Sequence, residues 1–113
     1  MLVRFLESLR MPIRFAVSFS KKAEQDLEEI WSFIAADNSD NATKFILNLE
    51  KQVESLGRFP ERCPLIPENA LLRGKYRHLI YGHYRSIFRI SGKNVYIIRI
   101  VNSARLLQPA MVE

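Results

Sequence analysis

The sequence predicts an α+β protein in which a helical hairpin packs on an antiparallel sheet, in the order β-α-α-β-β-β. Two amphipathic segments joined by a few polar residues predict the hairpin, and alternating segments separated by Gly-containing turns predict the later strands. A chain of 113 residues fits a single domain, which we assign to residues 11–113. Residues 1–10 are set apart as an N-terminal extension, because Met11 offers an alternative start.

The first half of the chain predicts one strand and two helices. The strand is expected over residues 14–19, where every second residue is phenylalanine or valine. Ser20 is suited to cap a helix whose apolar residues recur at helical spacing, namely Ala23, Leu27, Ile30 and Ile34. The polar run at 37–40 ends this helix and supplies capping oxygens for a second, which ends near Gly57. The short connection predicts that the two helices are antiparallel.

Three strands are expected after the proline-rich connection of residues 60–72, over residues 76–81, 84–90 and 95–101. Gly82 at the first position of a two-residue turn predicts a type II′ hairpin, because glycine tolerates the positive φ required there. The last strand is apolar on both faces except at Arg99, which predicts a central strand covered on both sides.

Positive charge is concentrated in the last third of the chain. Residues 1–72 hold nine Lys or Arg against eleven Asp or Glu, whereas residues 73–113 hold eight against one. This segregation indicates a surface for a polyanion, either nucleic acid or an acidic protein segment. The candidate phosphate- or target-binding side chains are Lys75, Arg77, Arg85 and Arg105. The same pattern is equally compatible with ordinary solvated residues.

Catalysis is only weakly indicated. Cleavage of RNA through its own 2′-hydroxyl would need groups that move protons beside those cations. The candidates are His78, Tyr81, His83 and Tyr84, for which a core or turn role is favoured. Two histidines and one cysteine at unrelated spacings predict no metal site, and no motif predicts a cofactor. A third reading, recognition of a partner peptide at the sheet edge or beside the hairpin, needs no catalytic residue.

Several individual residues invite structural interpretations. Cys63 is expected to be a free thiol, exposed or half-buried, and Trp31 to pack beside the apolar helix stripe. The acidic residues of the first helix are expected to form a solvated face, namely Glu24, Asp26, Glu28 and Glu29. The absence of a secretory signal and of an apolar run near ~20 residues predicts a cytoplasmic protein without membrane contact.

From about residue 13 to residue 105 the sequence resembles the ParE/RelE superfamily, the toxins of bacterial type II toxin–antitoxin (plasmid-stabilisation) modules. The resemblance covers four segments in order: FAVSFSKKAEQDLEEIWSFIA, NATKFILNLEKQVESLGRFPERCP, KYRHLIYGHYRSIFRI and VYIIRIVNSAR. Each segment alone is a loose match, but their order and spacing together are specific.

The resemblance implies a growth-inhibiting toxin that a cognate antitoxin neutralises in a hetero-oligomer. ParE-type members act on DNA gyrase without nuclease residues, whereas RelE-type members cut mRNA on the ribosome. By motif, Arg85 matches the phosphate-contacting arginine of the ribonucleases, and Arg105 matches the arginine that follows the last strand. Lys75 and Arg77 fall near further basic positions, so a RelE-like enzyme would use these four as its catalytic set.

Two departures from the ribonuclease pattern favour a ParE-like gyrase inhibitor, which is not an enzyme. Many relatives carry histidine where this chain has Asn102, and the C-terminal LLQPAMVE contains neither tyrosine nor histidine. Asparagine does not exchange a proton near neutral pH. A RelE-like ribosome-dependent endoribonuclease is the alternative, and a non-toxic protein-binding module on the same fold is the third.

Overall fold

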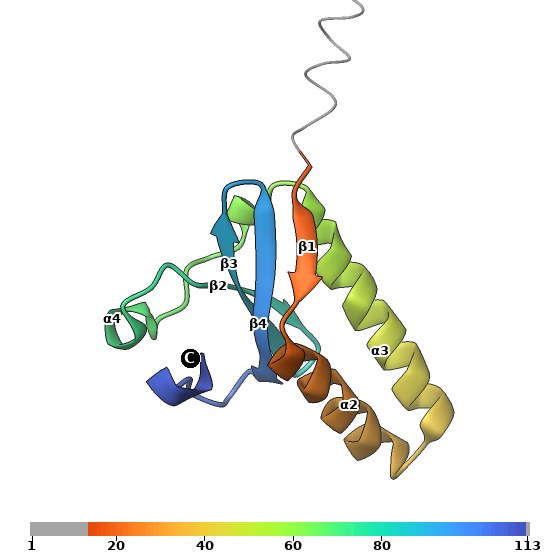
Figure 1. The fold of residues 1–113 in the computed structure, drawn as a ribbon. Coiled ribbons are helices and arrows are strands. Elements are labelled where there is room, and N and C mark those ends of the chain that lie inside the picture. Colours follow the sequence, from red (N-terminus) through yellow and green to blue (C-terminus); the bar gives the residue numbers. More distant parts are fainter. Residues whose placement is uncertain (1–13, 113) are drawn as a thin grey trace, which may run out of the picture.

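The computed structural model describes residues 14–112, so the expected extension at residues 1–10 lies outside the described residues. The main elements follow the predicted order (Figure 1): β1 (Ala16–Phe19), α2 (Lys21–Ala35), α3 (Ser39–Glu54), α4 (Asn69–Leu72), β2 (Arg77–Tyr81), β3 (Tyr84–Ser91) and β4 (Asn94–Asn102). Short 3-10 turns cover Ser55–Gly57, Pro60–Arg62 and Pro109–Met111. The α+β class and the order β-α-α-β-β-β are confirmed; the single turn of α4 and the 3-10 turns add to that order.

The four strands form one sheet in the order β1-β4-β3-β2. Strands β2, β3 and β4 are antiparallel as predicted, but β1 pairs with β4 in parallel, with Val17 opposite Val95. No tight turn joins β1 to β4, so the local sequence does not determine their relative direction. The two tight turns between the other strands begin at Gly82 and Gly92, each with a φ of 58°.

The helical hairpin covers one face of the sheet. The Ser20 hydroxyl accepts a hydrogen bond from the Ala23 N–H at 3.0 Å and donates to the Ile98 carbonyl at 2.7 Å, so it caps α2 and ties it to β4. The Asn38 side chain caps α3 in the same way, accepting from the Asn41 N–H at 3.0 Å. The main core lies between hairpin and sheet and includes Ile30, Leu49, Val53, Leu56, Phe88, Val95 and Ile97.

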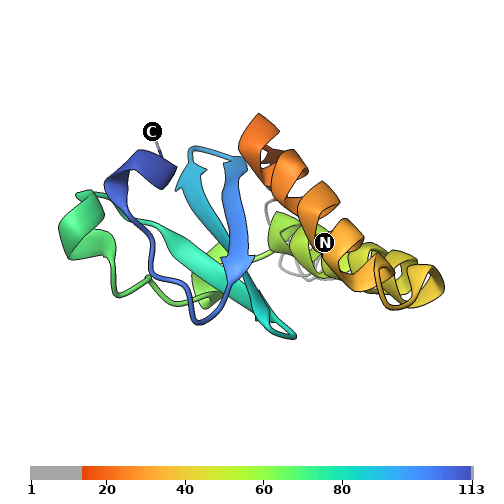
Figure 2. The ribbon, with the colours of Figure 1, turned by 90° about the horizontal axis from the view of Figure 1, so that it is seen from below.

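The opposite face of the sheet is covered by the region around α4 and by the C-terminal segment after β4 (Figure 2). These two segments and the sheet form a smaller buried cluster of Ile66, Ile87, Val101 and Leu107. The central strand β4 is therefore covered on both sides, which confirms the prediction from its apolar sequence. This second cover determines the environment of the basic hairpin.

Candidate target-binding site

Arg85 is the most strongly bound residue of the predicted basic set. It lies on the β3 face opposite the helical hairpin, is only 4% exposed, and forms a bidentate ion pair with Glu68. One Nη atom also donates to the main-chain carbonyl of Arg105 at 2.9 Å, and the other lies 3.2 Å from Nδ1 of His78. The Arg85 guanidinium is therefore held by protein groups inside the fold.

The loop before β2 brings Glu68 to this position. The Asn69 side chain accepts from the Tyr76 N–H and donates to the Tyr76 carbonyl, each at 2.9 Å, so the loop is closed onto the start of β2. Glu68 also accepts the N–H of Leu107 at 2.9 Å. The Glu68 carboxylate thus joins the α4 region, β3 and the C-terminal segment, and we call Glu68, His78, Arg85 and the Arg105 carbonyl the clasp.

The electrostatics of the clasp follow from its hydrogen bonds. The Arg85 guanidinium, aided by the Leu107 N–H and opposed by burial, lowers the pKa of Glu68 from 4.5 to about 2. Burial, and then the positive charge of Arg85, lower the pKa of His78. Because arginine can only donate, His78 accepts through Nδ1 and is the neutral tautomer with its proton on Nε2.

The other three predicted residues differ in their availability. Arg77 donates to the main-chain carbonyls of Glu61 and Cys63, so it holds the loop against β2. Lys75 and the Arg105 side chain are exposed. The structure brings Arg85 to the backbone of Arg105, and it leaves Lys75 and Arg105 as the two predicted cations with exposed side chains.

Arg105 lies at the mouth of a shallow cleft of about 220 Å³ between α2 and the end of the sheet. The cleft is lined by residues that include Glu29, Phe33, Tyr84, Asn102 and Arg105. The Asn102 side chain accepts the N–H of Ala104 at 2.9 Å, so it shapes the turn that leads to Arg105. This cleft is the open surface nearest to the predicted residues at the end of β4.

The candidate proton carriers have structural roles. Tyr81 and Tyr84 pack against Phe45, with ring centroids 5.4 and 5.8 Å apart. His83 is exposed in the turn, and its carbonyl accepts the Ser103 N–H at 2.8 Å. In the same hairpin, Arg89 lies over the ring of Tyr96, 4.6 Å from its centroid. Much of the hairpin's positive charge therefore contacts other parts of the protein.

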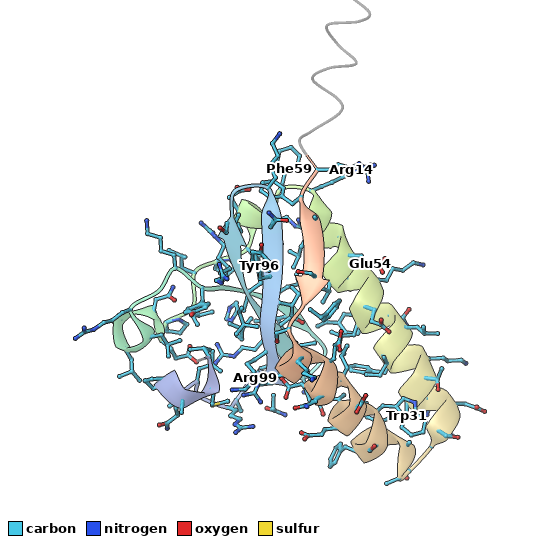
Figure 3. All side chains as sticks on the ribbon, viewed as in Figure 1. Arg14, Trp31, Glu54, Phe59, Tyr96 and Arg99 are labelled. Atoms are coloured by element: carbon cyan, nitrogen blue, oxygen red, sulfur yellow. The ribbon has the colours of Figure 1, made fainter. Side chains whose placement is uncertain are left out.

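The prediction for Asp26 was wrong. Asp26 is buried and bonds the Arg99 guanidinium at 2.8 and 2.9 Å, as well as the Ile100 N–H at 2.9 Å. The carboxylate of Asp26 raises the pKa of Arg99 above its usual value. Figure 3 shows Arg99 on β4 beside α2. The sequence signal was available, because Asp26 falls on the apolar stripe, one position before Leu27, and Arg99 is the only charge in its strand.

Cys63 is also more buried than predicted, at 4% exposure. Burial raises the pKa of its thiol, although Arg62 and Arg77 oppose that shift. A thiol in this state is a poor nucleophile near neutral pH. Among residues 14–112, no group of three or more His, Cys, Asp or Glu side chains is arranged to hold a metal ion.

The family was identified by comparison with known proteins. Residues 17–107 match the family model described as "ParE toxin of type II toxin-antitoxin system, parDE". The chain therefore belongs to the ParE toxin family of type II toxin–antitoxin systems. A search of curated protein sequences returned no match. No helix within residues 14–112 is long and apolar enough to cross a membrane.

Two solved structures share the fold. A chain of the chromosomal ParDE toxin–antitoxin system from P. aeruginosa is 22% identical, with a TM-score of 0.64, covering 79% of this chain and 96% of that one. A chain of the toxin–antitoxin complex RelBE2 from Mycobacterium tuberculosis is 26% identical, with a TM-score of 0.54, covering 82% and 95% respectively. The predicted ParE/RelE fold is thus confirmed.

Proposed function

We propose that this toxin stops growth by inhibiting DNA gyrase and that a cognate antitoxin neutralises it in the cytoplasm. The observation that carries the proposal is the state of Arg85. Its motif match is to an arginine that contacts phosphate in the ribonucleases, yet here Glu68 fills its guanidinium with a bidentate carboxylate. A guanidinium in that state has little capacity left for a scissile phosphate.

The proton chemistry supports binding over RNA cleavage. Acid–base catalysis requires a group that exchanges protons near neutral pH beside the reacting atoms. Asn102 has no such proton and serves the turn after β4. His78 is partly buried against a cation that lowers its pKa. A toxin that acts by holding its target needs neither group, and this proposal requires no metal or cofactor.

The proposed contacts to the target are the exposed cations Lys75 and Arg105. Arg77 and Arg85 act in this proposal as positioning residues, since their guanidinium groups hold the loop and the C-terminal segment next to those cations. An acidic antitoxin segment would be attracted to the same surface. The likeness to chains from the ParDE system and the RelBE2 complex supports an antitoxin partner and a toxin–antitoxin hetero-oligomer.

A RelE-like, ribosome-dependent mRNA endonuclease is the second candidate, supported by the 26% identity to a RelBE2 chain. In that case Lys75, Arg77, Arg85 and Arg105 would form the catalytic set, and Glu68 would have to release Arg85 when RNA binds. A non-toxic protein-binding module is the third candidate, and it would be favoured if expression without any partner left growth unchanged.

The test is a plasmid supercoiling assay with the purified protein, bacterial gyrase and ATP, run beside an assay of mRNA cleavage on ribosomes. We expect loss of supercoiling with accumulation of linear DNA, and intact mRNA. Unchanged gyrase activity from a protein that still stops growth would overturn the gyrase assignment. Cleaved mRNA in that case would establish the second candidate.

A further inference from the structure

A groove of about 400 Å³ runs between α2 and α3, away from the clasp. Its lining combines three apolar side chains with three carboxylates: Glu24, Leu27, Glu28, Trp31, Ile46 and Glu50. A second hollow adjoins it along α3, shares Glu50, and adds Leu47 and Glu54. Together they form a surface with apolar residues between glutamates, which we call the acidic groove.

The apolar residues of the acidic groove are held in place but remain accessible. Trp31 is 39% exposed, and its indole N–H donates to the Thr43 hydroxyl on α3 at 3.1 Å. Figure 3 shows Trp31 near the end of the hairpin where α2 meets α3. Leu47 is 60% exposed beside it on α3. Ordered apolar side chains that remain in water mark a contact surface rather than a core.

The charges of the acidic groove are one-signed and available. Within residues 14–112, the ion pairs are those of Glu68 with Arg85 and Asp26 with Arg99, and neither involves the groove glutamates. Lys51 is the one basic residue among the lining residues of the two hollows. A ligand that fits here must bring positive charge to flank its apolar contacts.

We propose that the acidic groove binds a basic amphipathic helix of a partner protein. Residues Glu24, Leu27 and Trp31 lie three or four positions apart, so they repeat along one face of α2. A helix laid beside two antiparallel helices presents its own residues at that spacing. Leucines of such a helix would contact Trp31, and its Lys or Arg side chains would reach the glutamates.

This inference is independent of the proposed action on gyrase. The C-terminal third carries the positive charge that suits an acidic partner, whereas the acidic groove selects for the opposite sign. A single partner segment of one charge therefore cannot suit both surfaces. The two surfaces divide the molecule into a basic side and an acidic side, each with its own class of ligand.

The test uses the fluorescence of Trp31, which is the only tryptophan in the sequence. The full-length protein is titrated with a helical peptide of Leu and Lys at amphipathic spacing, and with a matched peptide carrying Glu in place of Lys. We expect a saturable shift of Trp31 emission with the basic peptide only. The double variant Glu28→Lys/Glu50→Lys should bind it roughly tenfold more weakly or worse, since two attractions become repulsions. Glu61→Lys, an exposed change outside the groove, is the matched control and should bind as the wild type does.

Three outcomes would overturn the proposal. Equal binding of the acidic peptide, or equal loss in Glu61→Lys, would show that the groove does not select a basic helix. Trp31 emission that depends on protein concentration alone would assign the groove to a second copy of the chain. Altered emission in Arg4→Glu/Arg10→Glu without peptide would assign it to the first residues of the same chain.

Discussion

Glu68 and Arg85, 17 positions apart in the sequence, form a buried ion pair that joins the α4 region to the middle of the sheet. The same carboxylate accepts the Leu107 N–H, so the C-terminal segment is fixed by the pair as well. This relationship explains much of the charge in the hairpin: Arg85 bonds Glu68, Arg77 bonds the loop carbonyls, and Arg89 lies over an aromatic ring.

Removing one partner of this pair is expected to destabilise the protein strongly. Glu68→Gln leaves the Arg85 guanidinium buried without a countercharge, and such losses cost roughly 3–5 kcal/mol. The double variant Glu68→Leu/Arg85→Met should recover a large part of that loss, because no unpaired charge remains. Urea denaturation of the three proteins measures the difference. A cost below about 0.5 kcal/mol for Glu68→Gln, as for an ordinary surface change, would contradict the pair's structural role.

Stability is expected to fall in acid in two steps. Folding lowers the pKa of His78 below 6.5, so the contribution of neutral His78 is complete above pH 6.5 and declines below it. Folding lowers the pKa of Glu68 from 4.5 to about 2, so its contribution is complete above pH 4.5 and is lost as the pH falls toward 2. Thermal unfolding across this range should show a flatter acid limb for Glu68→Gln than for the wild type. Parallel limbs would assign the acid sensitivity to other carboxylates.

The two turn glycines allow a matched comparison. Gly82 and Gly92 both have a φ of 58°, where alanine is strained by roughly 1–2 kcal/mol. A Cβ on Gly82 would also lie 3.1 Å from the Phe45 ring, whereas one on Gly92 would meet nothing within 4 Å. We therefore expect Gly82→Ala to lower the free energy of unfolding more than Gly92→Ala. Equal losses in denaturant titrations would show that Phe45 yields without cost.

Removing the two exposed cations is expected to reduce toxicity without unfolding the protein. In Lys75→Ala/Arg105→Ala the clasp is retained, because Arg105 contributes only its main-chain carbonyl to it. We expect at least tenfold more protein to be needed for growth arrest in induced cells, and an unchanged melting temperature. Lys44→Ala/Lys93→Ala removes the same charge from exposed positions elsewhere and should remain toxic. Equal toxicity of both double variants would remove Lys75 and Arg105 from the target surface.

Local patterns were sufficient to predict the elements and the two caps. Ser20 and Asn38 precede apolar residues at helical spacing, and both side chains accept hydrogen bonds from the first turns of α2 and α3. Gly82 marks the turn between β2 and β3, and the apolar run of β4 correctly indicated a strand covered on both faces. These signals lie within a few residues of the structure they determine, which is why one sequence reveals them.

The sequence by itself determined the order of elements, their amphipathic faces and the excess of positive charge in the last third of this toxin. Only the tertiary structure decided what those charges do, because ion pairs such as Asp26 with Arg99 join residues 73 positions apart. It likewise decided that β1 runs parallel to β4 and that Arg85 lies beneath the α4 region. Whether a strand arginine contacts solvent or a carboxylate depends on which distant segment covers that face of the sheet, and no local pattern carries that information.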